Sequence, residues 1–424
     1  MGPTLTFDKS FLQSLSLDEA VILDQLFSCV VTPLFFVELL GSLVKPDKPD
    51  RPTSAQIVAG LAERTPVAHG YMNTYHRDVA VSDLMGNTAS MDYRPAIAGG
   101  IPVRVEDRSG VVFEKSPEAE AFDRWQDGQF SVVEKNFAAE WRARLASGHL
   151  RDEAHWLRSL VAREARPKSH ETAFTQAAAI VAGAGQSYRV FRAASEYFGL
   201  SERMMNVAVK RWKAAGSKPL RKYAPFAAHC FHVDLYFKLA LTNGLISDQR
   251  SSNAVDIAYL HYLPFAQVFA STDRLHRTSA PLFLTDKQRF VWGAELKADL
   301  ARLNSIYLGL PDNQKQQGLF TLVKSPPHDD QGLCARLWDD LRPGWRTPAP
   351  PSPPMSAAQE REIIARSKGI MRAARSPQGI PIGPATDPDH LVLQRHIPFQ
   401  RGSWRMFSAK VEEAERRGEN RNGD

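Results

Sequence analysis

Four acidic residues occupy positions from which side chains could meet and do chemistry: Asp8, Glu38, Asp256 and Asp273. Asp8 follows an alternating polar and apolar run that predicts a strand, and Asp273 closes another strand-like run. Asp256 opens an apolar helical run that is expected to break at Pro264, and Glu38 lies in a predicted helix that is apolar nearly all round. Carboxylates are preferred ligands of Mg²⁺ and Mn²⁺, and such ions can activate water for attack on a phosphodiester.

These acids can act together only if the elements that carry them share one edge of a sheet. The N-terminal pattern alternates strand and helix, which predicts a parallel α/β sheet. In such a sheet the carboxyl ends of strands and the amino ends of helices meet at one edge, where ligands bind. Ser16 and Glu19 have the spacing of a capping box, which predicts a helix start. The expected strands are residues 4–7, 28–32 and 267–271, and the expected helices are residues 17–26, 34–44, 53–63, 224–245 and 286–307.

A structural role is the alternative for each acid. Asp8 and Asp273 have the places of ordinary strand-end or turn residues, and Asp256 that of an ordinary acid at a helix N-terminus. Glu38 is harder to explain this way, because an unpaired glutamate is costly to bury unless a lysine or arginine pairs with it. Four carboxylates at one edge would also repel one another without a cation. We therefore expect a divalent metal site.

The order of the acidic motifs resembles the PIN-domain nucleases. The resemblance rests on four short stretches: Phe7-Asp8-Lys9-Ser10, Val37-Glu38-Leu39-Leu40, Asp256-Ile257-Ala258-Tyr259-Leu260 and Ser271-Thr272-Asp273. It implies a PIN-like parallel sheet flanked by helices. It also implies a metal-dependent endonuclease whose products carry a 5′ phosphate, with Mg²⁺ or Mn²⁺ held by the four acids. RNA is the favoured substrate over DNA.

Two features depart from the family pattern. Lys9 replaces the small residue that the family has beside the first acid, and the gap between Glu38 and Asp256 is much too long. The gap implies a large, mostly helical insertion. The expected organisation has a catalytic core of residues 1–45 and 224–310 and an insertion of residues 46–223. The insertion carries a β-hairpin near 101–115 whose expected turn is residues 108–110. A loosely packed extension of residues 311–424 follows, with a proline-rich linker at 343–354.

Polar and basic residues near the acids, and a basic region of the insertion, are the expected contacts to nucleic acid. Between residues 140 and 222 there are sixteen Lys and Arg against seven Asp and Glu. Aromatic residues among them could stack on bases while the cations follow the phosphates. A solvated helical face explains the same pattern. The candidate contacts are Ser10, Thr272, Arg250, Arg274, His276, Lys210, Arg211 and Lys213, and the interspersed aromatics are Trp141, Trp156, Tyr188 and Trp212.

Other motifs point less clearly to a site. His229-Cys230-Phe231-His232 suggests zinc, but helical spacing turns its side chains to different faces and no second cluster matches it. Asp234 and Asp248 are possible further acids of the site. Gly183-Ala184-Gly185 lacks the third glycine and the preceding strand of a dinucleotide-binding loop.

Length, charge and cysteine content bound the class of protein. The 424 residues predict two or three domains, and the net charge of +6 favours polyanionic partners without identifying them. Three separated cysteines fit reduced thiols, and polar residues interrupt the apolar stretch 21–44, so we expect a cytoplasmic protein without a membrane span.

Two other functions stay open at this point. The chain could be a catalytically inactive PIN-like module that binds nucleic acid or supports assembly, for which Lys9 is the best support. It could also be a toxin or defence effector held inactive by an inhibitory protein partner. A homo-oligomer is compatible with each of these functions.

Overall fold

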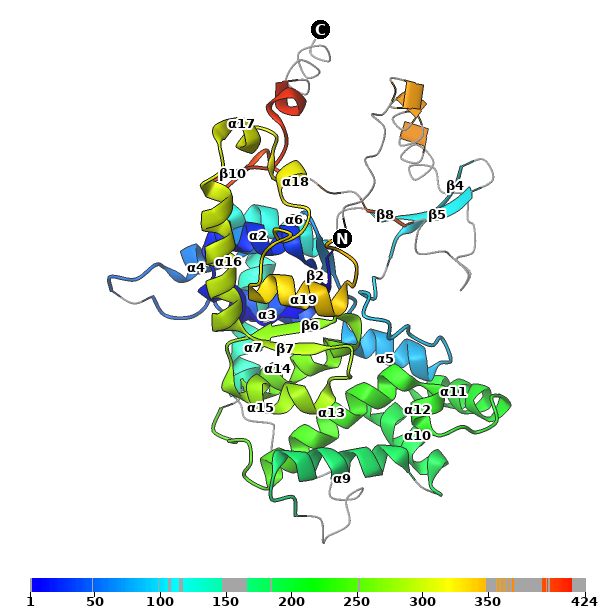
Figure 1. The fold of residues 1–424 in the computed structure, drawn as a ribbon. Coiled ribbons are helices and arrows are strands. Elements are labelled where there is room, and N and C mark those ends of the chain that lie inside the picture. The colour runs from blue at the N-terminus through cyan, green and yellow to red at the C-terminus, as the bar shows by residue number, and fades with distance from the viewer. Residues whose placement is uncertain are drawn as a thin grey trace.

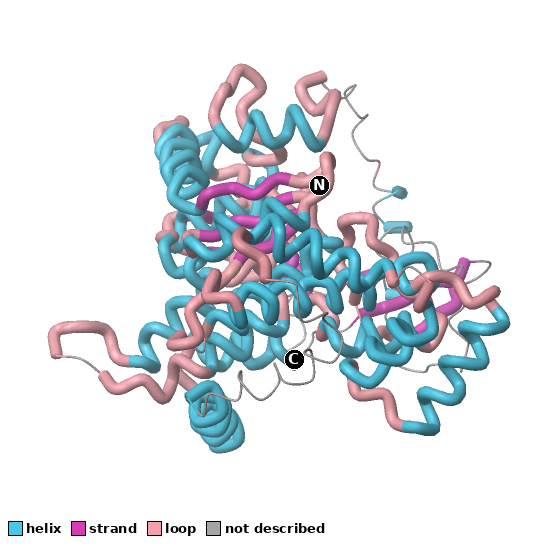
Figure 2. Tube along the Cα trace, turned by 90° about the horizontal axis from the view of Figure 1, so that it is seen from below, coloured by secondary structure: helices cyan, strands magenta, loops and turns pink. Residues whose placement is uncertain are grey.

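The computed structural model describes residues 2–47, 49–97, 99–105, 108–113, 117–146, 166–183, 185–250, 252–347, 391–393, 395 and 397–413, together with isolated positions between 356 and 369. A five-stranded parallel sheet forms its centre (Figures 1 and 2). In spatial order the strands are β3 (Gly70–Met72), β2 (Ser28–Val31), β1 (Thr4–Phe7), β6 (Val268–Ser271) and β7 (Arg289–Trp292). The predicted α/β fold with a helical insertion is confirmed.

The strand order places a topological switch point between β1 and β6. From β1 the chain adds β2 and β3 on one side, and it later adds β6 and β7 on the other. Ligands of open parallel sheets bind in the crevice beyond the carboxyl ends of the strands at such a point. The residues that directly follow β1 and β6 are therefore the first to examine.

Helices that follow the strands flank the sheet, and local sequence determines where they start. The Ser16 hydroxyl accepts the Glu19 N–H at 3.2 Å, and the Glu19 carboxylate accepts the Ser16 N–H at 2.7 Å. This capping box begins α2 at the predicted residue. The helices around the sheet are α1 (Lys9–Ser14), α2 (Leu17–Leu26), α3 (Pro33–Leu40), α4 (Ser54–Arg64), α14 (Asn253–Ala258), α15 (Arg274–Phe283) and α16 (Gly293–Leu308), with the 3₁₀ helix η1 (Tyr259–Phe265) after α14.

The inserted region is mostly helical, as predicted, and its later helices lie beyond one end of the sheet in Figure 1. Besides α4, the described helices of the insertion are α5 (His76–Leu84), α6 (Pro117–Gln126), α7 (Val132–Ala146), α9 (His170–Ala182), α10 (Ser187–Tyr197), α11 (Glu202–Ala214) and α12 (Leu220–Tyr223). The long helix α13 (Pro225–Thr242), from the expected core, packs against α5 and α9 and ties this region to the core.

The predicted hairpin is present as β4 (Ile101–Val105) and β5 (Arg108–Phe113), which pair antiparallel. Residues 108–110, expected to form its turn, instead begin β5. The second strand also pairs in parallel with β8 (Leu391–Leu393), from near the C-terminus. This small sheet is therefore shared between the insertion and the C-terminal region.

Three expectations about the elements are wrong. The edge strand β3 comes from residues expected to lie wholly in the insertion, so part of 46–223 belongs to the central sheet. The stretch 286–307, expected as one helix, contains β7 before α16. Pro264, expected to break the chain, lies inside η1. All three cases involve short elements, whose pattern is too brief to identify without their tertiary partners.

The described part of the C-terminal extension packs into the core, contrary to expectation. In α19 (Leu333–Leu341), the Trp338 indole donates to the carbonyl of Leu26 at 3.1 Å. In the hairpin of β9 (Gln400–Arg401) and β10 (Trp404–Arg405), Arg401 pairs with Asp24 at 3.1 Å, and both side chains are buried. Two short helices, α17 (Asp312–Lys315) and α18 (Leu319–Leu322), precede α19, and the N–H of Phe320 in α18 donates to the main-chain oxygen of Met406, just after the hairpin, at 3.3 Å. The predicted linker lies outside the described residues from position 348 onward.

No helix in the described parts of the chain has the length and apolar character needed to cross a membrane.

Candidate active site

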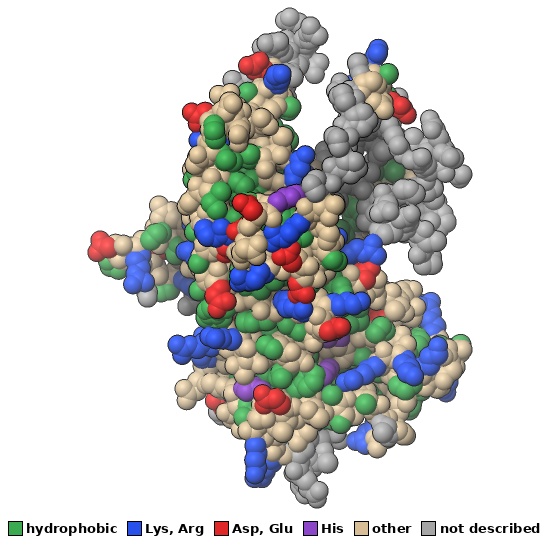
Figure 3. Space-filling model, viewed as in Figure 1, with side chains coloured by type: hydrophobic (Ala, Val, Ile, Leu, Met, Phe, Trp, Pro, Cys, Tyr) green, Lys and Arg blue, Asp and Glu red, His purple; other side chains and the backbone are tan. Residues whose placement is uncertain are grey.

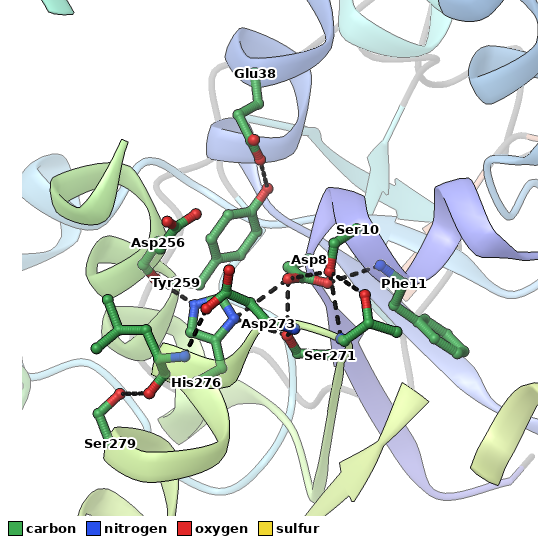
Figure 4. A network of polar contacts seen from close by, with 12 residues as sticks. Asp8, Ser10, Phe11, Glu38, Asp256, Tyr259, Ser271, Asp273, His276 and Ser279 are labelled. Carbon is green, nitrogen blue, oxygen red and sulfur yellow. Dashed lines mark hydrogen bonds and ion pairs between the residues drawn. The ribbon is translucent and has the colours of Figure 1, made fainter. Parts of the chain in front are cut away.

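Asp8 stands at the centre of a polar network directly after β1 (Figure 4). One oxygen of its carboxylate accepts the N–H of Phe11 at 2.9 Å, which caps α1. The other oxygen accepts the hydroxyls of Ser10 and Ser271, each at 2.8 Å, and lies 3.2 Å from Nδ1 of His276. The switch point of the sheet therefore holds a buried and fully engaged carboxylate.

His276 supplies a positive charge to this network. Its side chain is fully buried, its Nε2 lies 2.5 Å from the main-chain oxygen of Asp256, and its Nδ1 lies 2.8 Å from the hydroxyl of Ser271. Burial alone would lower its pKa, but the hydrogen bond and the charge of Asp8 outweigh burial and raise the pKa to about 9. Both ring nitrogens then donate, and His276 is an imidazolium at neutral pH.

The same contact affects Asp8 in the opposite direction. Burial would raise the pKa of Asp8, but the hydrogen bond and charge of His276, with the N–H of Phe11, lower it below its ordinary value. Asp8 and His276 are therefore a charged pair in the folded protein.

Glu38 reaches the same region from α3. Its carboxylate accepts the hydroxyl of Tyr259 at 2.8 Å. Burial raises its pKa, the charge of Asp8 adds to the rise, and Lys9 and Tyr259 oppose it. The Lys9 ammonium itself donates to the main-chain oxygen of Glu38 at 3.3 Å and to the hydroxyl of Ser42 at 2.7 Å. Lys9 therefore binds the end of α3 while its charge partly offsets that of Glu38.

Asp256 and Asp273 complete the group of acids. Burial raises the pKa of Asp256 to about 7, against the opposing charge of His276. The negative charges of Glu38, Asp273 and Asp8 add to this rise. Asp273 caps α15 by accepting the N–H of Leu275 at 2.6 Å. Figure 4 shows the four acids arranged around the ring of Tyr259 and the imidazole of His276.

The donor chemistry of this edge fits a hard divalent cation, although the side chains do not yet form a ligand set. Four carboxylates offer oxygen ligands. Burial raises the pKa values of Glu38 and Asp256, and the charges of neighbouring acids add to the rise, so a cation would favour their charged forms. Among the described residues, however, no three His, Cys, Asp or Glu side chains are placed to hold one ion together. Metal binding here would require side chains to reorient.

The candidate substrate contacts lie in two regions of the structure, and the first region contains Ser10, Thr272, Arg274 and Arg250. Ser10 and Thr272 belong to the site, since their hydroxyls lie 2.7 Å apart and Ser10 donates to Asp8. Arg274 is exposed at the first turn of α15, beside Asp273, and Arg250 is exposed just before α14.

Lys210, Arg211 and Lys213 are exposed on α11, at the far end of the helical region from α14 and α15 (Figure 1). Arg211 also donates to the main-chain oxygen of Met85 at 2.6 Å. Figure 3 shows Lys and Arg side chains gathered over that end with few acids, whereas both charges alternate over the sheet. These three residues therefore lie apart from the acids.

Most of the other motifs have structural roles. His229 and His232 meet the main-chain oxygens of Leu260 and Phe174, at 2.9 and 3.0 Å, so they do not share a ligand. Asp234 pairs with His261, and Asp248 lies in an exposed turn. Gly183 ends α9 in the left-handed conformation, with φ of 55°.

The aromatics of the basic region differ in exposure. Trp212 is buried against Phe191, whereas Tyr188 is 48% exposed and Trp141 is partly buried. Trp156 lies outside the described residues. Trp212 therefore serves the core, and only Tyr188 and Trp141 remain accessible to a ligand.

Two residues of the site were not identified from the sequence. Tyr259 reads as one apolar residue of a helical run, and Ser271 as the last residue of a strand. Ser271 nevertheless donates to Asp8 and accepts the N–H of Asp273 at 2.9 Å. Its position directly before Thr272-Asp273 at a strand end is the one signal that could have indicated its role.

Comparisons with protein families, with curated proteins and with solved structures found no match to this chain. The interpretation of the site therefore rests on its residues and on the fold.

Proposed function

We propose that this chain is a metal-dependent endonuclease with a PIN-like core that hydrolyses RNA in preference to DNA. The observation that carries the proposal is the meeting of four carboxylates, from four separate elements, at the switch point of a parallel sheet. Structural acids need no such arrangement. Burial raises the pKa values of Glu38 and Asp256, and the charges of neighbouring acids add to the rise. A divalent cation would neutralise that charge.

In this mechanism Asp8, Glu38, Asp256 and Asp273 would hold Mg²⁺ or Mn²⁺. The metal would activate water and stabilise the charge that develops on the phosphodiester. Ser10 and Thr272 would position the backbone of the substrate through their hydroxyls. The exposed Arg274 would contact the phosphate, because a guanidinium matches its geometry.

The test is loss of hydrolysis when one carboxylate loses its charge. Asp256→Asn preserves size and hydrogen bonding, and we expect it to abolish Mg²⁺- or Mn²⁺-dependent cleavage of labelled single-stranded RNA with an unchanged circular dichroism spectrum. Asp286→Asn is the matched control, because Asp286 is exposed and lies outside the network. A variant Asp256→Asn as active as the parent would reduce this acid to a structural role.

An inactive module that binds nucleic acid or supports assembly is the second candidate. The observation that favours it is the engagement of Asp8: both of its oxygens accept hydrogen bonds from the protein, and His276 neutralises its charge. Such a site is stable without a metal. This candidate predicts that the parent protein binds a single strand but cleaves neither RNA nor DNA with either metal.

A further inference from the structure

An open cavity of about 500 Å³ lies beside the acidic site, lined by helices of the core and of the insertion. This is within the usual range for pockets that take small ligands. Helices α3 and α14 contribute to both places, since Leu34 and Ala258 line the cavity while Glu38 and Asp256 belong to the acids. The residues on which the inference rests are His76, Arg77, Trp141, Tyr197, Lys238 and His261.

The floor of the cavity contains a buried histidine with an unused nitrogen. His261 is 2% exposed, and its Nε2 lies 3.0 Å from a carboxylate oxygen of Asp234. Its Nδ1 is buried, and no group in the described part of the chain hydrogen-bonds to it. Nε2–H donates to Asp234, so Nδ1 is the ring nitrogen left for a ligand. A buried polar atom without a partner is costly, and a ligand that hydrogen-bonds to it would satisfy it.

A second histidine provides the complementary group. The ring of His76 lies against that of His261, with centroids 4.3 Å apart. Burial and then the neighbouring His261 lower the pKa of His76 well below its ordinary value, so its ring is neutral. The hydroxyl of Tyr262 lies 3.1 Å from both the N–H and the Nδ1 of His76. The Tyr262 hydroxyl accepts from the N–H of His76 and donates to its Nδ1, so the ring proton of His76 lies on Nε2.

The walls of the cavity are aromatic and carry positive charge. The Lys238 ammonium lies 4.7 Å from the ring centre of Tyr197, and Arg77 donates to the main-chain oxygen of the same residue at 2.9 Å. Trp141, from α7, also lines the cavity. Flat aromatic surfaces with nearby cations suit a planar heterocycle that is attached to phosphates.

A metal is a poorer occupant than an organic ring. His76, His261 and Asp234 are ligand types for zinc or iron, but Asp234 binds the far nitrogen of His261. No group of three metal-ligating side chains is present among the described residues. The pair of histidines instead presents two ring nitrogens, Nδ1 of His261 and Nε2–H of His76, with which the edge of a nucleobase can form hydrogen bonds.

We propose that this cavity binds the base of a nucleotide, held by His261 Nδ1 and His76 Nε2–H between aromatic walls. The assignment of a nucleotide rests on the proposed function, because the cavity adjoins the acids that would cleave a strand. A base held there would belong to the substrate beside the scissile phosphate. The site would then help to choose which phosphodiester reaches the acids.

The experiment measures nucleotide binding without metal or cleavage. The full chain in EDTA is titrated calorimetrically with each of the four 5′-ribonucleoside monophosphates and with ribose 5-phosphate, which lacks a base. We expect at least one nucleotide to bind at least tenfold more tightly than ribose 5-phosphate. His261→Gln keeps a donor for Asp234 but removes Nδ1, and it should weaken that binding about three- to tenfold.

Matched variants separate the site from general effects on the fold. His229→Gln makes the same substitution at a partly buried histidine that does not line the cavity, and it should leave binding unchanged. Trp141→Ala removes a partly buried wall and should weaken binding even if His261→Gln fails to fold. Equal binding of nucleotides and ribose 5-phosphate, or full binding by both cavity variants, would overturn the proposal. Binding without any hydrolysis would overturn only the nuclease function.

Discussion

At the candidate site, each carboxylate meets a different electrostatic environment. Asp8 has a histidinium and several hydrogen bonds, so it is charged at neutral pH. The pKa of Asp256 is about 7 and the pKa of Glu38 lies above its ordinary value, because burial and neighbouring acids disfavour the charged form of each carboxylate. A cation that enters this edge gains most from the two acids that the protein leaves least neutralised. The side of the site that faces α3 and α14 is therefore the expected place for a metal.

The hydrogen bond between Tyr259 and Glu38 should stabilise the fold measurably. Tyr259→Phe removes the donor and leaves a buried carboxylate with one partner fewer, which should lower the free energy of unfolding by about 1–3 kcal/mol. The measurement is urea denaturation of Tyr259→Phe, Glu38→Gln and the double variant. We expect a coupling energy of at least about 0.5 kcal/mol. Additive effects would mean that the hydroxyl and the carboxylate do not act together.

The sequence allowed the edge of the site to be predicted, but not its internal contacts. The strand and helix pattern indicated where Asp8, Asp256 and Asp273 stand, because parallel topology brings such positions to one edge. The partner of Glu38 is Tyr259, which is 221 residues away in a stretch whose apolar residues predict ordinary core. Pairing over that distance depends on tertiary packing and leaves no local signal.

At the scale of elements, local chemistry explains the successes and the failures. Helix α2 begins at its capping box and α3 at Pro33, since each start has a specific residue type at a specific place. The strands β3 and β7 have three and four residues and lack such markers. They become strands because β2 and β6 offer hydrogen-bonding edges, which only the assembled sheet provides.

The start of α16 should tolerate no side chain at Gly293. A Cβ there would lie 2.6 Å from a side-chain carbon of Thr272 and 2.8 Å from one of Phe11. Gly293→Ala should therefore lower the free energy of unfolding by about 1–3 kcal/mol and shift Thr272 within the site. The control is Gly309→Ala at the other end of the helix, where the nearest atoms are 3.4 Å away. Equal stability of the two variants in thermal denaturation would contradict this packing.

The packing of α13 should make the protein sensitive to acid. Burial lowers the pKa of His229 to about 3 and that of His232 to about 4, from 6.5. Below pH 6.5 the unfolded chain takes up protons that the folded chain does not, so stability falls as the pH falls. We expect a loss of about 2 kcal/mol for each histidine between pH 7 and pH 5.

Urea denaturation at both pH values tests the origin of this loss. His229→Gln and His232→Gln should each reduce the difference between pH 7 and pH 5, since the substituted residue does not titrate. His328→Gln, at an exposed histidine, is the control. A difference that persists in the variants of α13 would assign the acid sensitivity to other groups.

At the scale of the whole molecule, segments distant in sequence complete the core. Asp24 accepts the N–H groups of Val67, Ala68 and His69, and it also pairs with Arg401. One buried carboxylate thus joins α2, the segment before β3 and the C-terminal hairpin. Composition suggested a loose extension because charged and proline-rich stretches surround the few residues that dock. The docking itself depends on these tertiary contacts.

Loss of the buried pair should therefore destabilise the entire core. Arg401→Gln leaves the carboxylate of Asp24 without its cation, and we expect a loss of about 3–5 kcal/mol in the free energy of unfolding. Arg405→Gln breaks a partly exposed pair with Glu412 in the same hairpin and should cost at most about 1 kcal/mol. Similar midpoints of chemical denaturation for the two variants would show that the hairpin contributes little to the core.

The basic end of the helical region should bind nucleic acid at a distance from the acids. Neutralising Lys210, Arg211 and Lys213 together to glutamine removes three exposed charges on α11. Each lost phosphate contact reduces the number of counterions released on binding. The slope of log affinity against log salt for a single strand should therefore become shallower by about 2.

A variant with equal charge loss elsewhere distinguishes a specific track from a general attraction. Lys287, Lys324 and Arg336 are also exposed but lie on the side of the molecule that carries β7 and α19. Their triple glutamine variant should keep the slope of the parent when affinity for a labelled single-stranded RNA is measured at several salt concentrations in EDTA. If both triple variants change the slope equally, the net charge attracts the strand and α11 has no special part. If neither changes it, the strand follows a path that avoids α11 and these residues, and the basic cluster is a solvated helical face.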